Sequence, residues 1–209
     1  VMRLVFTVLV FSCLAKSFVF GQTGPGGVGN ATGDNGQPQN VLWLRANSGI
    51  SNSGGLVDTW TDQSGNSNSA TGSGATRPTY TASDVDFNNF PSITFPNTAL
   101  SPFFLQIPDN DNLDNTSTLS VILLMRPTTN TPNTNLALLS KRNSSGVEQS
   151  YFFDITNVHR YRVTIGTGAT ANLAGAVSSL GQNDIVSFTM SGATKTGHLD
   201  GTINGTAPI

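Results

Sequence analysis

The sequence TLSVILLM, residues 118–125, is the most apolar run that follows the amino-terminal segment. Asn, Thr and Ser precede it, and Pro127 and two threonines follow it, so turn-forming residues bound it on both sides. A short apolar run between such residues is typical of a buried strand. We therefore predict that residues 118–125 form a central strand of a sheet.

Shorter runs of the same kind lie on both sides of this segment. They are apolar or alternating, and no stretch keeps the 3.6-residue period of a long helix. The predicted strands are residues 41–44, 56–60, 91–95, 103–107, 136–139, 151–155, 161–165, 185–190 and 197–203. Many short strands separated by Asn, Gly and Pro indicate an all-β chain, and we expect an antiparallel β-sandwich.

Residues 1–21 have the composition of a secretory signal peptide. Arg3 gives a positively charged start, residues 4–14 are almost wholly apolar, and the predicted cut follows Gly21. The apolar run is too short to span a bilayer as a helix, so we expect no transmembrane segment after signal removal. The alternative is a lipobox ending at Cys13, but the apolar residues left outside it argue against this. We predict a secreted or cell-surface protein.

Residues 22–39 are rich in Gly, Asn and Pro, and we predict a flexible leader because they offer little apolar surface to bury. The folded domain is expected over residues 40–209. The only cysteine, Cys13, lies in the signal peptide, so the domain depends on its core, or on a metal, rather than on disulfides.

Charged residues make up only 11% of the chain, and the formal net charge is −2. Asn, Thr, Ser and Gly take their place, which predicts a polar but largely uncharged surface. A nucleic-acid or anionic-lipid partner needs a basic patch or stripe. The composition offers none, so it excludes these partners.

The folded part opens with three motifs, VLWLRA at residues 41–46, VDTWTDQSGN at residues 57–66 and RPTY at residues 77–80. They resemble the opening of a laminin G-like domain of the concanavalin A-like lectin and glucanase superfamily, as found in secreted bacterial surface proteins. The similarity continues in order through residues 91–95, 107–121, 187–189 and the Asp200-Gly201 turn. It implies a concanavalin A-like jelly roll.

Two departures from the family pattern stand out. Residues 123–125 are Leu-Leu-Met where the family usually has a Trp, and the family's closing strands are missing before Ile209. We therefore expect residues 40–209 to be a laminin G-like domain that lacks its last strands. A sheet edge exposed in this way favours self-association.

The superfamily that this chain resembles also includes glucanases. Their catalysis needs paired carboxylates on alternate residues of one strand. Glu148 is the only glutamate, and no predicted strand carries alternating Asp or Glu. His159 and His198 are the only histidines and are expected at the surface. We predict no catalytic residues and a protein that is not an enzyme.

Calcium is the one candidate cofactor. Asp109 and Asp111 lie in DNDNLDN, residues 109–115, which packs oxygen ligands of the kind that calcium takes. Asp62, in the DQSGN turn, is a further candidate ligand. The alternative is that both segments form Asx turns without a metal.

Carbohydrate binding needs exposed aromatic rings beside amides and carboxylates. Trp43, between Leu42 and Leu44, and Trp60, which follows Leu56-Val57, are the only tryptophans, and we expect them in the core rather than on a sugar-binding surface. The sugar-facing residues therefore stay unassigned.

Three hypotheses remain for the function. The first is a non-catalytic adhesion module that binds glycans or other cell-surface proteins. The second is a structural spacer without a ligand, and the third is an accessory domain of a secreted polysaccharide hydrolase.

Overall fold

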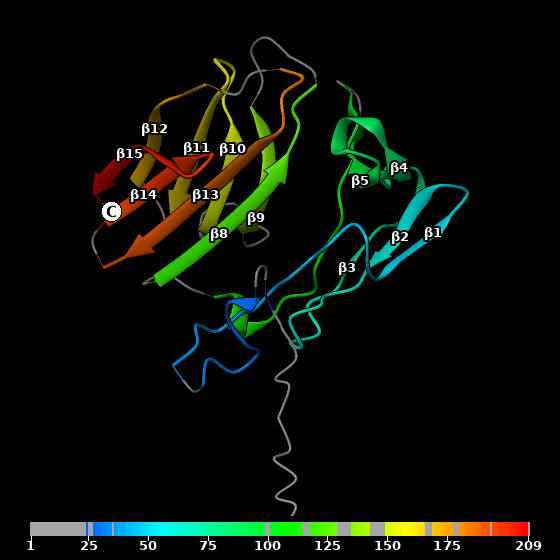
Figure 1. Ribbon diagram of the computed structural model, residues 1–209, viewed down its shortest axis with the longest axis horizontal. Coiled ribbons are helices and arrows are strands. Elements are labelled where there is room, and N and C mark those ends of the chain that lie inside the picture. Colours follow the sequence, from blue (N-terminus) through cyan, green and yellow to red (C-terminus); the bar gives the residue numbers. More distant parts are fainter. Residues whose placement is uncertain are drawn as a thin grey trace, which may run out of the picture.

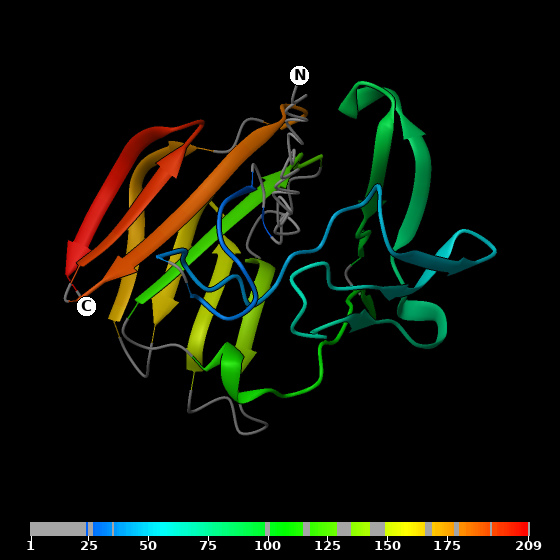
Figure 2. The same cartoon turned by 60° about the horizontal axis from the view of Figure 1, so that its bottom comes forward.

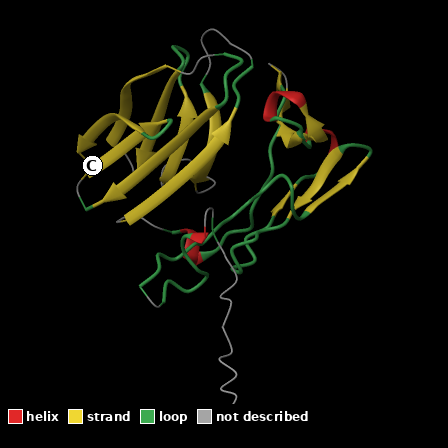
Figure 3. Cartoon of the chain, viewed as in Figure 1, coloured by secondary structure: helices red, strands yellow, loops and turns green. Residues whose placement is uncertain are grey.

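The computed structural model describes residues 24, 27–34, 36–98, 101–114, 118–128, 135–142, 149–165, 169–177, 180–192 and 194–208. Strands dominate these residues, and the helices are short single turns (Figure 3). All strand pairings within the sheets are antiparallel. The prediction of an all-β chain is thus confirmed. The predicted signal peptide, residues 1–21, lies outside the described residues.

The carboxyl-terminal half contains two four-stranded sheets (Figure 1). One has the order β15-β14-β13-β8, and the other has the order β12-β11-β10-β9. The strands are β8 (Thr118–Met125), β9 (Leu136–Arg142), β10 (Gln149–Ile155), β11 (Arg160–Ile165), β12 (Ala169–Val177), β13 (Asp184–Ser191), β14 (Thr194–Leu199) and β15 (Thr202–Pro208).

The predicted hairpin turn at Asp200-Gly201 is present between β14 and β15. Both residues have positive φ, +50° for Asp200 and +78° for Gly201, as a tight hairpin turn with right-handed strand twist requires.

The two sheets contribute to one apolar core. Its buried residues come from β10, β11 and β13, and half-buried residues of β8, β9 and β14 pack against them. The buried members are Tyr151, Phe153, Ile155, Tyr161, Val163, Val186, Phe188 and Met190. The rings of Phe153 and Phe188, one from each sheet, lie 4.8 Å apart in a tilted arrangement, so the core joins the sheets directly.

Residues 118–125 do form a strand, but β8 lies at the edge of its sheet and the prediction of a central strand is wrong. Side chains along β8 alternate between exposed and half-buried, as they do in a strand with one face toward a core. Leu119 and Val121 pack on the core, whereas Ile122 and Leu124 are more than 60% exposed. The continuous apolar run hid this alternation.

Two buried aspartates have side-chain partners, Asp154 on the face of β10 opposite to the core residue Phe153 and Asp184 beside the core residue Tyr161. The Asp154 carboxylate is fully buried and accepts hydrogen bonds from Arg162, including one from Nε at 2.8 Å. The Tyr161 hydroxyl donates to Asp184 at 2.5 Å. A buried charge is tolerated only when such partners replace water.

A smaller five-stranded sheet occupies the amino-terminal half and lies beside the other two sheets (Figures 1 and 2). Its order is β1-β2-β4-β5, with β3 paired to β2. The strands are β1 (Ile50–Ser53), β2 (Leu56–Trp60), β3 (Ala70–Thr71), β4 (Thr79–Asp84) and β5 (Phe90–Thr94). Short elements complete this half: η2 (Gly74–Thr76), η3 (Val85–Phe87), β6 (Asn97–Thr98), β7 (Ser101–Pro102) and η4 (Asp111–Leu113).

Two predicted strands differ from the structure in this half. Residues 41–44 form no strand, and within residues 103–107 only Gln106 pairs, through an isolated bridge to Thr71. In the described part of the predicted leader, the Asn30 N–H donates to the Pro38 carbonyl at 3.1 Å.

Candidate functional site

The candidate site is a polar junction where the loops around residues 41–49, 61–69 and 109–114 meet. Its centre is the Asp62 side chain, which is only 8% exposed. The Asp62 carboxylate accepts hydrogen bonds from the Trp43 N–H at 2.9 Å, the Ser64 N–H at 2.9 Å and the Asn68 N–H at 3.0 Å. The Ser64 hydroxyl donates a fourth, at 2.7 Å. The carboxylate therefore fixes both the DQSGN turn and the segment that carries Trp43.

A set of asparagine amides extends from this carboxylate. Asn68 is 2% exposed, and its Nδ2 donates to the Val41 carbonyl at 2.7 Å and to Asn112 Oδ1 at 3.0 Å. Its Oδ1 accepts from Asn110 at 2.8 Å. Asn66 Oδ1 accepts from Asn112 Nδ2 at 3.3 Å, so four amides link the two loops. Such a network is stable only when its buried members are satisfied.

Lys141, on β9, connects this junction to the larger sheets. Its ammonium donates to the Asn110 carbonyl at 2.9 Å and forms ion pairs with Asp109 at 2.9 Å and Asp114 at 2.6 Å. Partial burial disfavours the ammonium, but the hydrogen bonds to Asp114 and Asp109 outweigh it and raise the pKa of Lys141. The hydrogen bond from Lys141 and its positive charge hold the pKa of Asp109 below its ordinary value.

The structure gives two of the predicted calcium ligands, Asp62 and Asp109, partners from the protein itself. The four acceptor interactions of Asp62 come from N–H and O–H donors, whereas calcium needs the oxygen lone pairs that these donors occupy. Asp109 faces the Lys141 ammonium, which takes the place that a cation would have, and Asp111 is exposed. Among the described residues, no three His, Cys, Asp or Glu side chains gather to hold a metal. The Asx-turn alternative fits this segment, since Asn110 Oδ1 accepts from the Asn112 N–H at 3.2 Å.

The two tryptophans, expected in the core, lie next to this junction and outside the described apolar core cluster. Both are half-buried. The Arg45 guanidinium carbon lies 5.0 Å from the centre of the Trp43 ring, and the Trp60 indole N–H donates to the Arg45 carbonyl at 2.9 Å. Arg45 thus touches both tryptophans, and we call these three residues the tryptophan surface.

Polar side chains border the tryptophan surface. Asn47 Oδ1 accepts from Arg45 Nε at 3.0 Å, and the Ser48 hydroxyl donates to Gln63 Oε1 at 3.2 Å. Gly49 has φ +74°, and a Cβ there would lie 2.7 Å from Gln63 Nε2. This turn therefore needs glycine, and it follows the residues Asn47 and Ser48 that contact Arg45 and Gln63.

The two histidines were predicted at the surface, and both are half-buried. Their rings lie partly inside the protein, where His159 Nε2 and His198 Nδ1 are buried with no hydrogen-bond partner among the described residues. His159 lies in the turn between β10 and β11, with φ +60°, and His198 lies on β14.

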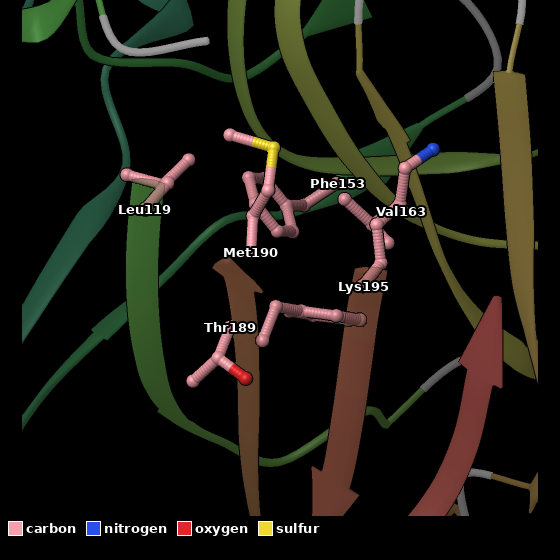
Figure 4. Close-up of a pocket in the computed structure, with 7 residues that line it drawn as sticks. Leu119, Phe153, Val163, Thr189, Met190 and Lys195 are labelled. Carbon is pink, nitrogen blue, oxygen red and sulfur yellow. The ribbon is translucent and has the colours of Figure 1, made fainter. Parts of the chain in front are cut away.

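A separate cavity lies between the two four-stranded sheets and is too small for a ligand. Leu119, Phe153, Val163, Thr189, Met190 and Lys195 line it (Figure 4). Its volume is about 10 Å³, close to what a single water molecule requires. Lys195 is buried on β14, and burial lowers the pKa of its amine.

Comparison with known proteins adds no assignment. No family model matches the chain, and no curated protein matches it. In the described part of the chain, no helix has the length and apolar character needed to cross a membrane.

The Lys141 contacts predict how stability changes with acid. The pKa of Asp109 in the folded protein lies below its ordinary value of 3.8. The ionised Asp109 therefore contributes fully to the free energy of unfolding at pH values above 3.8. This contribution is lost as the pH falls below 3.8 and through the pKa that Asp109 has in the folded protein. Lys141→Met keeps the alkyl chain but removes the charge, so this variant should lose less unfolding free energy on acidification than the wild type. Urea unfolding at neutral pH and below pH 3.8 measures the difference.

The matched control is Arg160→Met, since Arg160 is exposed and has no ion pair among the described residues. It should follow the wild-type acid dependence. If Lys141→Met also followed it, the ion pairs with Asp109 and Asp114 would not exist in solution.

The Lys141→Met variant also tests whether the junction binds calcium. We expect neither calcium nor a chelator to shift the thermal unfolding midpoint of the wild type, because Lys141 occupies the carboxylates. Lys141→Met leaves Asp109, Asp114 and the Asn110 carbonyl without their cation, and calcium should raise its midpoint. A calcium-dependent rise in the wild type would contradict this account of the junction.

Proposed function

We propose that this chain is a secreted, non-catalytic carbohydrate-binding module of a bacterial cell-surface protein. We further propose that it is an antiparallel β-sandwich of the concanavalin A-like, laminin G-like kind. The observation that carries the functional proposal is the tryptophan surface, in which Trp43 and Trp60 are half-buried rather than buried.

The arrangement of the larger sheets supports the fold proposal. Two four-stranded antiparallel sheets share one core, with Phe153 of one sheet against Phe188 of the other. Sheets packed through alternating inward residues are the basis of β-sandwiches. The motifs at residues 41–46 and 57–66, on which the family resemblance rests, surround the candidate site.

The chemistry of the tryptophan surface supports sugar binding. An aromatic ring offers an apolar face for the C–H groups of a sugar, and its indole keeps a polar edge. The neighbouring Asn47, Ser48 and Gln63 carry amide and hydroxyl groups, which hydrogen-bond to sugar hydroxyls. A hydrogen-bonded turn already orders these groups, so little side-chain entropy remains to be lost on binding.

The use of the carboxylates supports a non-catalytic role. Asp58 pairs with Arg77, Asp62 is saturated by donors, and Asp84 accepts from Ser92 at 2.5 Å. Asp154 and Asp184 are buried and accept hydrogen bonds from Arg162 and Tyr161. Hydrolysis of a glycosidic bond needs two carboxyl groups that flank the substrate. The aspartates with partners here are tied to structural roles.

Binding can be followed directly, since the two tryptophans of the chain both belong to the proposed site. A glycan that binds there should change the intrinsic tryptophan emission in a saturable way. Trp60→Ala should weaken binding by about tenfold or more, as expected for an aromatic residue at the centre of an interface. Titration with a panel of soluble polysaccharides provides the measurement.

Phe90→Ala is the control, because Phe90 is 60% exposed on β5 and lies outside the proposed site. This variant should bind as the wild type does. A panel in which no polysaccharide changes the emission would contradict the proposal and favour a structural spacer.

A further inference from the structure

We propose that the tryptophan surface selects acidic saccharides, with Arg45 binding a carboxylate of a uronic acid residue. This inference rests on the proposed function and names the class of sugar. It starts from the guanidinium of Arg45, which is exposed and lies over the Trp43 ring.

The orientation of the Arg45 side chain is fixed on two sides. Cation–π attraction holds its guanidinium to the Trp43 ring, with the guanidinium carbon 5.0 Å from the ring centre. Its Nε donates to Asn47 Oδ1 at 3.0 Å. The two terminal amino groups of Arg45 form no hydrogen bond with any described residue. A planar fork held in this way matches a carboxylate in the two-bond geometry.

Several other cations of the described region pair with a carboxylate, whereas Arg160, like Arg45, is exposed and forms no ion pair there. Arg77 pairs with Asp58, Arg126 with Asp86, and Lys141 with Asp109 and Asp114. The Arg45 guanidinium instead lies over the Trp43 ring and forms no ion pair with any described residue. The site therefore combines an apolar face with one unneutralised positive charge.

A uronic acid residue offers the complementary groups. Its ring has C–H groups that stack on an indole, and its carboxylate stands at the ring edge. With the ring on Trp60, a carboxylate directed toward Arg45 would pair with the guanidinium while ring hydroxyls face Asn47. The net charge of the chain is −2, so a general field does not attract a polyanion and selection depends on this local contact.

The test compares two polymers that differ only in charge, polygalacturonate and its fully methyl-esterified form. Tryptophan emission gives the affinity of the full chain for each. The wild type should bind polygalacturonate about tenfold more tightly, the equivalent of one charge-assisted contact. Added salt should reduce this preference, because an exposed ion pair is screened.

Two substitutions assign the preference to Arg45. Arg45→Gln should remove the preference, so that its affinities for the two polymers become equal, whereas Arg45→Lys, which keeps the charge but not the fork, should retain part of it. The thermal unfolding midpoints of both variants should stay close to that of the wild type, because only the exposed contacts of the guanidinium with Trp43 and Asn47 change and the Arg45 carbonyl that binds Trp60 remains.

The outcomes separate this inference from the proposed function. Equal wild-type affinity for the two polymers, or a preference that survives in Arg45→Gln, overturns the role of Arg45 but leaves sugar binding intact. Binding to dextran sulfate without binding to polygalacturonate overturns the assignment to a carboxylate. Binding to neither the two polymers nor any neutral glycan overturns both proposals.

Discussion

The buried carboxylate of Asp62 is the constraint on which the candidate site depends. It accepts four hydrogen bonds, three from backbone N–H groups and one from a hydroxyl, in a side chain that is only 8% exposed. An ionised acceptor makes stronger hydrogen bonds than a neutral one, and each donor would lose its partner if the carboxylate were removed. The segment that carries Trp43 has no strand pairing of its own, so this carboxylate fixes its position.

The attachment of the amino-terminal half to the rest of the chain is mainly polar. The core cluster draws on strands β8 to β11, β13 and β14, whereas the contacts between the halves include Lys141 with Asp109 and Arg126 with Asp86. Asn183 Nδ2 also donates to the Asp86 carbonyl, at 2.7 Å. Polar contacts specify geometry but add less stability than apolar burial. We therefore expect the amino-terminal half to unfold locally before the two larger sheets do.

Much of the strand content was predictable, because alternation and turn residues are local signals. The Asp200-Gly201 turn, for example, is set by two adjacent residues. The position of β8 at a sheet edge was not predictable, since Ile122 and Leu124 are as apolar as the residues that face the core. Exposure of these side chains depends on which strands pair, and the local sequence does not determine the strand order.

The candidate site was harder to predict than the strands. Asp62 and Asp109 were recognised as important oxygen-bearing residues, but as metal ligands. In the structure, the Asn68 N–H donates to Asp62, and Lys141, which is 32 residues away along the chain, pairs with Asp109. The sequence around a carboxylate does not show whether its partner is an N–H group, a lysine ammonium or a metal ion. The leucines beside Trp43 and the Leu56-Val57 pair before Trp60 predict core positions; the Arg45-Ala46-Asn47-Ser48 turn close after Trp43 is the signal for its half-buried position.

The most direct test of this account is amide hydrogen exchange in the wild type and in Asp62→Ala. In the wild type, the Trp43, Ser64 and Asn68 amides should be protected, because all three donate to the Asp62 carboxylate. In the variant these amides should lose protection while those of β10 and β13 keep it. Unchanged protection at the three amides would contradict the claim that this carboxylate organises the site.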